Sequence, residues 1–225
     1  MTRVKEKVKA IIFDMDGTII DTEHVWKNVT LDLLEREGVG PLCEDGKNFL
    51  KSLSGVGLSH STQALKQRFN LTREVEELIQ HKLEIANEHL ARNINFIEGF
   101  EVFHQKLRDH NIPSSIATNA HPKNLEGLVE RLNFKKYFGE NIYCIGHVNF
   151  IPKPNPDLFL HAAKQLGVKP EECVVFEDSL PGFQAAQAAG MKCIAIKNEL
   201  NKSLLDQVHD SIKTYHEAVE ALRKI

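Results

Sequence analysis

The sequence predicts an α/β protein with a parallel sheet, flanking helices and a helical segment inserted after the first strand. Three observations indicate this fold class. Short apolar runs rich in Val and Ile alternate with helix-like stretches, as they do in doubly wound sheets. A long, charged segment without a strand-like run separates the first apolar run from the others. The 225 residues, of which 42% are hydrophobic, suffice for one large domain or for a body with a smaller insert.

Five segments are predicted to be strands of a Rossmann-like parallel sheet. The first, residues 10–13 (AIIF), is apolar throughout and bounded by charged residues, which is typical of a strand buried on both faces. A small-residue helix is expected after the fourth strand, since Pro181 favours the start of a helix and Gly190 its end. The four later runs are residues 115–118 (SIAT), 142–145 (IYCI), 173–176 (CVVF) and 193–196 (CIAI).

The inserted segment, residues 22–92, is predicted to be helical. Its candidate helices are residues 24–36, 61–69 and 73–91, which are separated by glycine-containing breaks. The expected domains are therefore a sheet core, made of residues 1–21 and 93–225, and a helical domain of residues 22–92. Because the insert follows the first strand directly, it can lie over the carboxyl edge of the sheet, where open α/β sheets bind ligands.

Composition and charge narrow the possible classes of function. The chain has 28 Lys and Arg against 31 Asp and Glu, so its formal charge of −3 gives no attraction to nucleic acid polymers or anionic membranes. The four cysteines form no Cys-x-x-Cys pair and are too few for a disulfide framework, which favours a cytoplasmic location. The first apolar run is short, so neither a signal peptide nor a membrane span is predicted. No pattern indicates an oligomeric state.

Two pairs of acidic residues follow predicted strands. Asp14 and Asp16 leave the first strand, and Glu177 and Asp178 leave the fourth. If these strands are parallel neighbours, three or four carboxylates share a small volume, which is costly without a hard divalent cation such as Mg²⁺. A calcium loop of the EF-hand type does not fit, because Gly17 follows Asp16 directly. Taken alone, Asp16 and Gly17 are equally consistent with a solvated turn.

Three further residues could bind a phosphate group. Thr118 and Asn119 end the second strand, and a hydroxyl, an amide and free backbone N–H groups at such a turn suit phosphate oxygens. Lys153 lies between Pro152 and Pro154, which stiffen the backbone, and its charge would balance clustered carboxylates and a phosphoryl group. Taken alone, each of the three is more typical of an ordinary loop or turn than of a binding site.

Four segments, FDMDGT, SIATN, KPNPD and VVFEDSLPG, resemble in this order the four motifs of the haloacid dehalogenase superfamily. The helical insert resembles the C1-type cap domain of the subfamily that contains beta-phosphoglucomutase and many small-molecule phosphatases. The resemblance implies that Asp14 is a nucleophile that becomes an aspartyl phosphate. It also implies that Asp16 is the general acid and base.

The same resemblance implies the remaining site residues. Mg²⁺ would be held by the carboxylates of Asp14 and Asp178 and the backbone carbonyl of Asp16, with Glu177 in or near the coordination shell. The phosphoryl oxygens would be bound by a separate set of side chains, which are those of Thr118, Asn119 and Lys153. Asp16 is absent from true dehalogenases of the superfamily, so its presence favours phosphoryl transfer.

The expected function is a Mg²⁺-dependent phosphatase for a small phosphorylated metabolite, such as a sugar phosphate or a nucleotide monophosphate. Two alternatives are a phosphomutase resembling beta-phosphoglucomutase and a non-catalytic binding protein of the same fold. The mutase carries a cap histidine and a cap arginine where this chain has Trp26 and Leu58, although His24 lies nearby and Lys82 could serve in part. Trp26 is expected mainly to pack. The candidate specificity residues of the cap are His24, Trp26, Leu58 and His60.

Overall fold

The computed structural model describes residues 7–53, 56–90 and 94–225, apart from the side chains of Glu23, His24, Asn87 and Leu90. The side chain of His24 and the predicted domain boundary at residues 92 and 93 therefore lie outside the described residues. Within the described parts of the chain, no helix combines the length and apolar character that crossing a membrane requires.

The core is a parallel six-stranded sheet with the strand order β3-β2-β1-β4-β5-β6. The first strand therefore lies at the centre, between β2 and β4, and the chain winds outward from it in both directions. This confirms the predicted Rossmann-like fold. The strands are β1 (Ala10–Phe13), β2 (Ser114–Thr118), β3 (Ile142–Cys144), β4 (Cys173–Glu177), β5 (Lys192–Ile196) and β6 (Asp210–Ile212).

The five predicted strands are all present, with small differences at their ends. Ile145 was expected to end the third strand, but it begins the 3-10 turn η1 (Ile145–Val148) instead. The sixth strand, β6, was not predicted, because its three residues include the polar pair Asp210 and Ser211 and it lies at the edge of the sheet. Short edge strands carry little of the apolar pattern by which buried strands are recognised.

Alternate residues of β1 pack into two separate apolar layers. Ile11 and Phe13 belong to one cluster with side chains of α6 and α11, whereas Ala10 and Ile12 belong to another with side chains of α9 and α10. This alternation is expected for a strand covered on both faces. The flanking helices are α6 (Phe100–Asp109), α7 (Pro122–Arg131), α8 (Lys135–Phe138), α9 (Asp157–Leu166), α10 (Leu180–Ala188) and α11 (Ala218–Lys224). Further short 3-10 turns are η2 (Pro170–Glu172), η3 (Lys202–Gln207) and η4 (Tyr215–Glu217).

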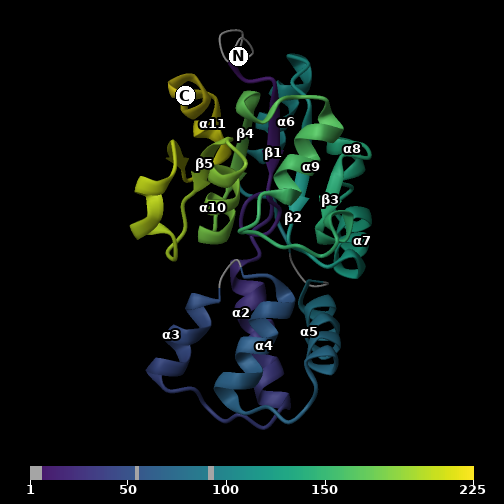
Figure 1. Cartoon of the computed structure of the whole chain (residues 1–225), viewed down its shortest axis with the longest axis vertical. Coiled ribbons are helices and arrows are strands. Elements are labelled where there is room, and N and C mark those ends of the chain that lie inside the picture. The colour runs from purple at the N-terminus through teal and green to yellow at the C-terminus, as the bar shows by residue number, and fades with distance from the viewer. Residues whose placement is uncertain (1–6, 54–55, 91–93) are drawn as a thin grey trace.

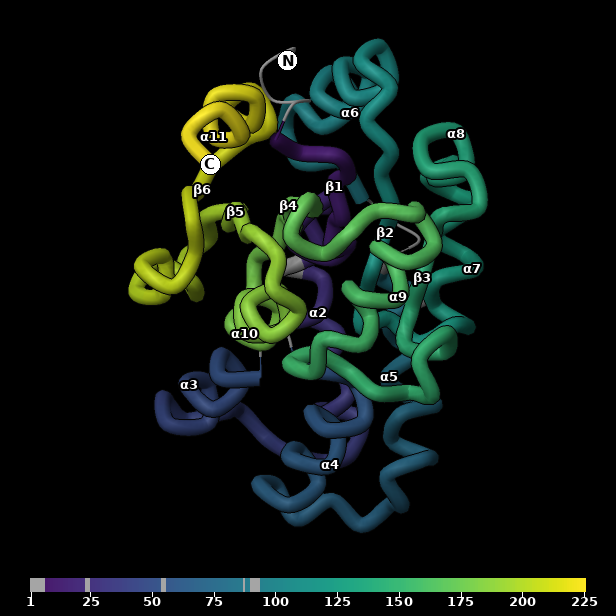
Figure 2. The backbone as a smooth tube through the Cα atoms, turned by 45° about the horizontal axis from the view of Figure 1, so that its top comes forward, coloured from purple at the N-terminus to yellow at the C-terminus, as the bar shows by residue number. Residues whose placement is uncertain are grey.

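The inserted segment forms a separate group of helices below the sheet (Figure 1). These are α2 (Glu23–Arg36), α3 (Glu44–Ser52), α4 (Leu58–Phe69) and α5 (Val75–Leu90), and a second view shows them gathered at the end of the molecule opposite α11 (Figure 2). Three of the four were predicted. Helix α3 was missed because it is only nine residues long, contains Gly46 and has only two apolar residues, Phe49 and Leu50, which are too few to show a helical repeat in the sequence.

A buried histidine in the apolar core predicts a specific loss of stability in acid. His104 of α6 is 1% exposed, and burial and the nearby Arg108 lower its pKa from 6.5 to about 4. The folded protein therefore binds fewer protons than the unfolded chain, so His104 costs stability as the pH falls from 6.5 to 4. We expect this contribution to reach about 3 kcal/mol.

The His104→Phe variant should lose correspondingly less stability across this pH range than the native protein. Denaturant unfolding at a series of pH values measures the difference, and the exposed His60→Gln variant serves as the control. The variant also leaves the Ser114 hydroxyl, which lies 2.9 Å from His104 Nε2, without this partner, so its stability can differ at every pH. The two proteins are therefore compared by how steeply the free energy of unfolding changes with pH. Parallel pH profiles for the native protein and His104→Phe would contradict the prediction.

Candidate active site

The two acidic pairs meet because the strands that carry them are direct neighbours. Phe13 of β1 and Phe176 of β4 are opposite one another in the parallel register, so Asp14 and Glu177 come next at the same edge of the sheet. The backbone N–H of Asp14 donates to the carbonyl of Phe176 at 2.9 Å. Oxygen atoms of Asp14, Glu177 and Asp178 lie within 4.8 Å of one another. The carboxylates converge as the sequence predicted.

Lys153 is the buried cation of this group. Its Nζ lies 2.6 Å from Asp14 Oδ1 and 3.0 Å from Glu177 Oε1, and its side chain is 1% exposed. It also lies over the ring of Phe159, 4.5 Å from the centroid. The loop that carries Lys153 is held in turn by Asn119, whose Oδ1 accepts from the backbone N–H of Lys153 at 2.9 Å. Lys153 therefore joins the ends of β1 and β4 electrostatically.

Glu177 is held by the start of the next helix. One carboxylate oxygen, Oε2, accepts from the backbone N–H groups of Asp178 at 2.5 Å and Ser179 at 2.8 Å. Ser179 also caps α10 by accepting from the N–H of Gly182. A Cβ atom at Gly182 would lie 1.9 Å from the carboxyl carbon of Glu177, so only glycine leaves room for this carboxylate. The small-residue helix predicted after the fourth strand is therefore present as α10 (Leu180–Ala188), and its first turn packs directly against the site.

Asp178 is positioned by two asparagines that sequence analysis did not identify. Asn198 Nδ2 donates to Asp178 Oδ2 at 3.0 Å, and the buried Asn201 donates to the backbone carbonyl of Asp178 at 2.7 Å. Gly17, with φ +73°, passes so close that a Cβ atom there would lie 2.3 Å from Asp178 Oδ2. The turn after β1 therefore closes against Asp178, and only glycine allows this approach.

The electrostatics of the cluster favour an added cation. Burial, together with Glu177 and Asp14, raises the pKa of Asp178 well above its usual range, and burial raises the pKa of Asp14 to about 8. Burial alone would lower the pKa of Lys153, but its carboxylate partners raise it, so this lysine stays charged. One lysine cannot neutralise three carboxylates. An all-oxygen group of this kind fits a hard divalent ion such as Mg²⁺.

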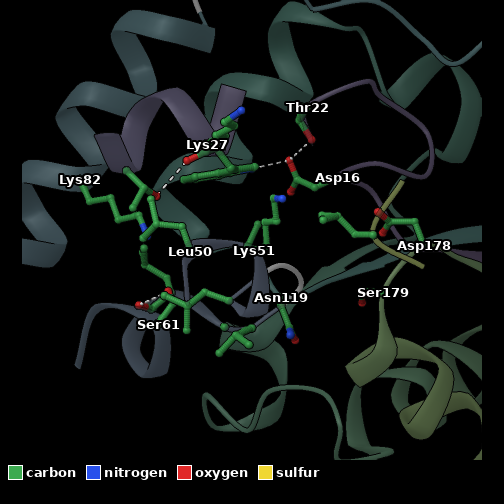
Figure 3. Close-up of a pocket in the computed structure, with 18 of the residues that line it drawn as sticks. Asp16, Thr22, Lys27, Leu50, Lys51, Ser61, Lys82, Asn119, Asp178 and Ser179 are labelled. Atoms are coloured by element: carbon green, nitrogen blue, oxygen red, sulfur yellow. Dashed lines mark hydrogen bonds between the residues drawn. The ribbon is translucent and has the colours of Figure 1, made fainter. Parts of the chain in front are cut away.

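Asp16 lies beside this group and is held by the helical insert. Both Thr22 Oγ1, at 2.8 Å, and Trp26 Nε1, at 2.9 Å, donate to the same oxygen, Asp16 Oδ1 (Figure 3). The expectation that Trp26 mainly packs is therefore incomplete: its ring packs against the core, and its indole N–H bonds to a candidate catalytic carboxylate. The indole is an obligatory donor with one N–H, a property that a search for catalytic residue types overlooks.

Thr118 and Asn119 lie where β2 ends, at the same edge of the sheet. The buried Thr118 hydroxyl accepts from the backbone N–H of Ala120 at 3.1 Å, which leaves its own hydrogen available to a ligand. The side-chain oxygen of Asn119 already accepts a hydrogen bond from the backbone N–H of Lys153, so its side-chain NH₂ group can donate to a ligand.

A cavity of about 790 Å³ lies between the sheet edge and the inserted helices. Its walls contain all seven candidate site residues together with Trp26 and Leu58 of the insert. His60 is exposed and does not line this cavity among the described residues. The candidate site residues in the wall are Asp14, Asp16, Thr118, Asn119, Lys153, Glu177 and Asp178.

Residues 11–196 match the family model of haloacid dehalogenase-like hydrolases. The chain belongs to this family. A Bacillus subtilis protein, YhcW, is 33% identical over 217 residues, which cover 90% of each chain. Fructose-1-phosphate phosphatase YqaB of Escherichia coli is 30% identical over 192 residues, covering 85% of this chain and 98% of the relative. A phosphorylated carbohydrates phosphatase of Thermotoga maritima is 29% identical over 225 residues, covering 97% of this chain and 100% of the relative.

Solved structures of the family share the fold. A haloacid dehalogenase-type hydrolase of family IA, variant 3, from Entamoeba histolytica superposes with a TM-score of 0.85 and 26% identity, covering 96% of this chain and 98% of that one. The superposition includes the inserted helices as well as the sheet, since it spans nearly the whole of both chains. The family resemblance inferred from the four motifs is confirmed.

Proposed function

We propose that this hydrolase is a Mg²⁺-dependent phosphatase that acts on a small phosphorylated metabolite. One observation carries the proposal: Asp14, Glu177, Asp178 and Lys153 form a buried charged cluster at the floor of a cavity that the helical insert covers. The named phosphatases among its relatives support the same class of reaction. Their printed substrates, fructose 1-phosphate and phosphorylated carbohydrates, are small phosphate esters, as the proposal requires.

In this proposal Asp14 attacks phosphorus and carries the phosphoryl group as an aspartyl phosphate. Asp16 protonates the leaving oxygen and then activates the water that hydrolyses the intermediate. A Mg²⁺ ion held by Asp14, Asp178 and the backbone carbonyl of Asp16, with Glu177 in or near the shell, would stabilise the negative charge of the transferring group. Three other side chains, Thr118, Asn119 and Lys153, bind the phosphoryl oxygens.

The inserted helices serve as the cap, and residues 22–92 form the cap domain. They supply the cavity wall opposite the sheet, including Trp26, Leu50 and Leu58, so they contact the leaving group rather than the phosphate. This division explains how one catalytic floor can serve different substrates in different relatives. It also makes the cap the place to search for specificity.

The experiment that tests the function is phosphate release from a panel of sugar phosphates and nucleotides, with Mg²⁺ or with a chelator. Metal-dependent release of phosphate is the expected result. A phosphomutase would instead convert a sugar phosphate to its isomer, require a bisphosphate activator and release no net phosphate. Absence of turnover by either route, with Mg²⁺ binding intact, would contradict the proposal and favour a binding protein.

Trp26 is expected to influence turnover more than substrate binding. Trp26→Phe keeps most of the ring but removes the donor to Asp16 Oδ1, so the carboxylate is held by Thr22 alone. Because hydrogen bonds to charged groups contribute about 1.5–3 kcal/mol, we expect kcat to fall about tenfold or more with little change in KM. Steady-state kinetics on the best substrate of the panel measures both constants.

Leu31→Ala is the matched control for Trp26→Phe, because Leu31 lines the cavity from the same helix and makes no bond to Asp16. We expect Leu31→Ala to change KM more than kcat. If Trp26→Phe changed KM and left kcat at its native value, Trp26 would be a wall of the substrate cavity and the positioning role would be wrong.

A further inference from the structure

Lys82 is a buried lysine of the cap that faces the cavity. It belongs to α5, is 5% exposed and lies in the cavity wall. Figure 3 shows its side chain reaching inward on the same side as Leu50 and Ser61, across the cavity from Asp16 and Asp178. No hydrogen bond or ion pair joins Lys82 to any residue that the structure describes.

An unpaired buried lysine is costly for a folded protein. Desolvation lowers the pKa of Lys82 from 10.5 to about 8, and no acidic group offsets this effect. At neutral pH the ammonium is still mostly charged. The described carboxylates of the cavity wall lie elsewhere. Glu44 pairs with Lys47, Glu199 pairs with Lys202, and Asp14 and Glu177 pair with Lys153. Asp16 and Asp178 lie across the cavity (Figure 3). Among the described residues, the free protein thus provides no counter-ion for this charge.

The hydroxyl groups of this part of the wall cannot take the place of Lys82 as donors, and the other lysines of the insert that line the cavity, Lys27, Lys47 and Lys51, are exposed. The hydroxyl of Ser61 donates to the carbonyl of Leu58 at 3.0 Å, and the hydroxyl of Thr30 donates to the carbonyl of Trp26 at 2.9 Å. Each hydroxyl has one hydrogen, so both are left as acceptors. Leu31, Leu50 and Leu58 make much of the remaining cap wall apolar.

We propose that Lys82 is the specificity-determining residue of the cap, and that it binds a single anionic group, a carboxylate, at the far end of the leaving group of the substrate. A monoanion fits because one lysine supplies one charge. A phosphate dianion would leave oxygens without donors, since the neighbouring hydroxyls are already committed. This inference rests on the proposed phosphatase function and defines the substrates as phosphate esters of hydroxycarboxylic acids with a partly apolar body.

The test compares alkyl phosphates of several chain lengths that end in a carboxylate, a carboxamide or a second phosphate. At the best length we expect kcat/KM for the carboxylate to exceed that for the carboxamide by about 10- to 100-fold, the size of a charge-assisted hydrogen bond. The preference should fall to near one in Lys82→Met. A native enzyme that does not distinguish carboxylate from carboxamide, or one that prefers the terminal phosphate, would overturn the proposal.

The matched control is Lys27→Met, which removes an exposed lysine from the wall of the same cavity and should keep the carboxylate preference. Lys82→Met should fold at least as stably as the native protein, because it removes an unpaired buried charge, and thermal unfolding verifies this. If a folded Lys82→Met variant still preferred carboxylate over carboxamide substrates, the carboxylate would bind to a residue other than Lys82.

Calorimetry with non-hydrolysable phosphonates of the same series separates this inference from the proposed function. If no ester of the series released phosphate, the phosphatase proposal would fail while binding could still be measured. Tighter binding of the carboxylate than of the carboxamide analogue, lost in Lys82→Met and retained in Lys27→Met, would support the site. Equal binding of the two analogues by the native protein would refute it.

Discussion

Replacing Asp14 with Asn is expected to abolish phosphate release and to preserve the fold. The amide is nearly the same size as the carboxyl group and can still accept from Lys153, but it cannot form an aspartyl phosphate. Loss of a covalent nucleophile costs on the order of 10⁴-fold or more in kcat in enzymes that use covalent catalysis. Phosphate release measured with Mg²⁺ at saturating substrate gives the ratio of the two rates.

The free energy of unfolding of Asp14→Asn should be equal to or higher than that of the native protein, although its activity is lost. Asp14→Asn removes one of three carboxylates that share a single lysine, so the variant should unfold at an equal or higher denaturant concentration without metal. Asp206→Asn, which removes an exposed carboxylate away from the site, is the control and should keep native turnover. Turnover within a few fold of native in Asp14→Asn would rule out Asp14 as the nucleophile.

Replacing Lys153 with Met is expected to produce the largest loss of stability among these variants. The change leaves the buried carboxylates of Asp14 and Glu177 without a cation, since Lys153 Nζ contacts Asp14 Oδ1 at 2.6 Å and Glu177 Oε1 at 3.0 Å. Removing one partner of a buried ion pair typically costs about 3–5 kcal/mol. Denaturant unfolding in the absence of metal measures this difference.

Added Mg²⁺ should restore part of the stability of Lys153→Met, because the ion neutralises the same carboxylates. Lys164→Met, which replaces an exposed lysine of α9, should change the free energy of unfolding by less than about 0.5 kcal/mol. A loss in Lys153→Met as small as that of the control would mean that the ion pairs contribute nothing to the fold, contrary to the geometry of the cluster.

Much of the core could be predicted because buried parallel strands carry a strong local signal. Residues 10–13 and 173–176 are continuous apolar runs, and each leads directly into an acidic pair, so both the strands and the convergence of Asp14 with Glu177 follow from sequence. The edge strand β6 and the polar helix α3 lack such a signal. Their positions depend on tertiary contacts rather than on periodicity.

The residue roles that escaped prediction are those that depend on packing between distant segments. Asn198 and Asn201 are unremarkable in a loop until β5 brings them against Asp178. Trp26 has the ordinary character of a packing residue until the fold brings its N–H to Asp16. Lys82 is one charged residue among many on a helix, and only the fold reveals that it is buried and has no ion-pair partner among the described residues.

The most direct test of the catalytic account is to trap the phosphoryl group on the protein. The enzyme is mixed with Mg²⁺ and its best substrate, quenched in acid during turnover, digested and analysed by mass spectrometry. The account predicts a peptide that carries one phosphoryl group on Asp14, in amounts that increase in Asp16→Asn, where hydrolysis of the intermediate is slowed. Rapid phosphate release with no phosphorylated Asp14 in either protein would contradict it.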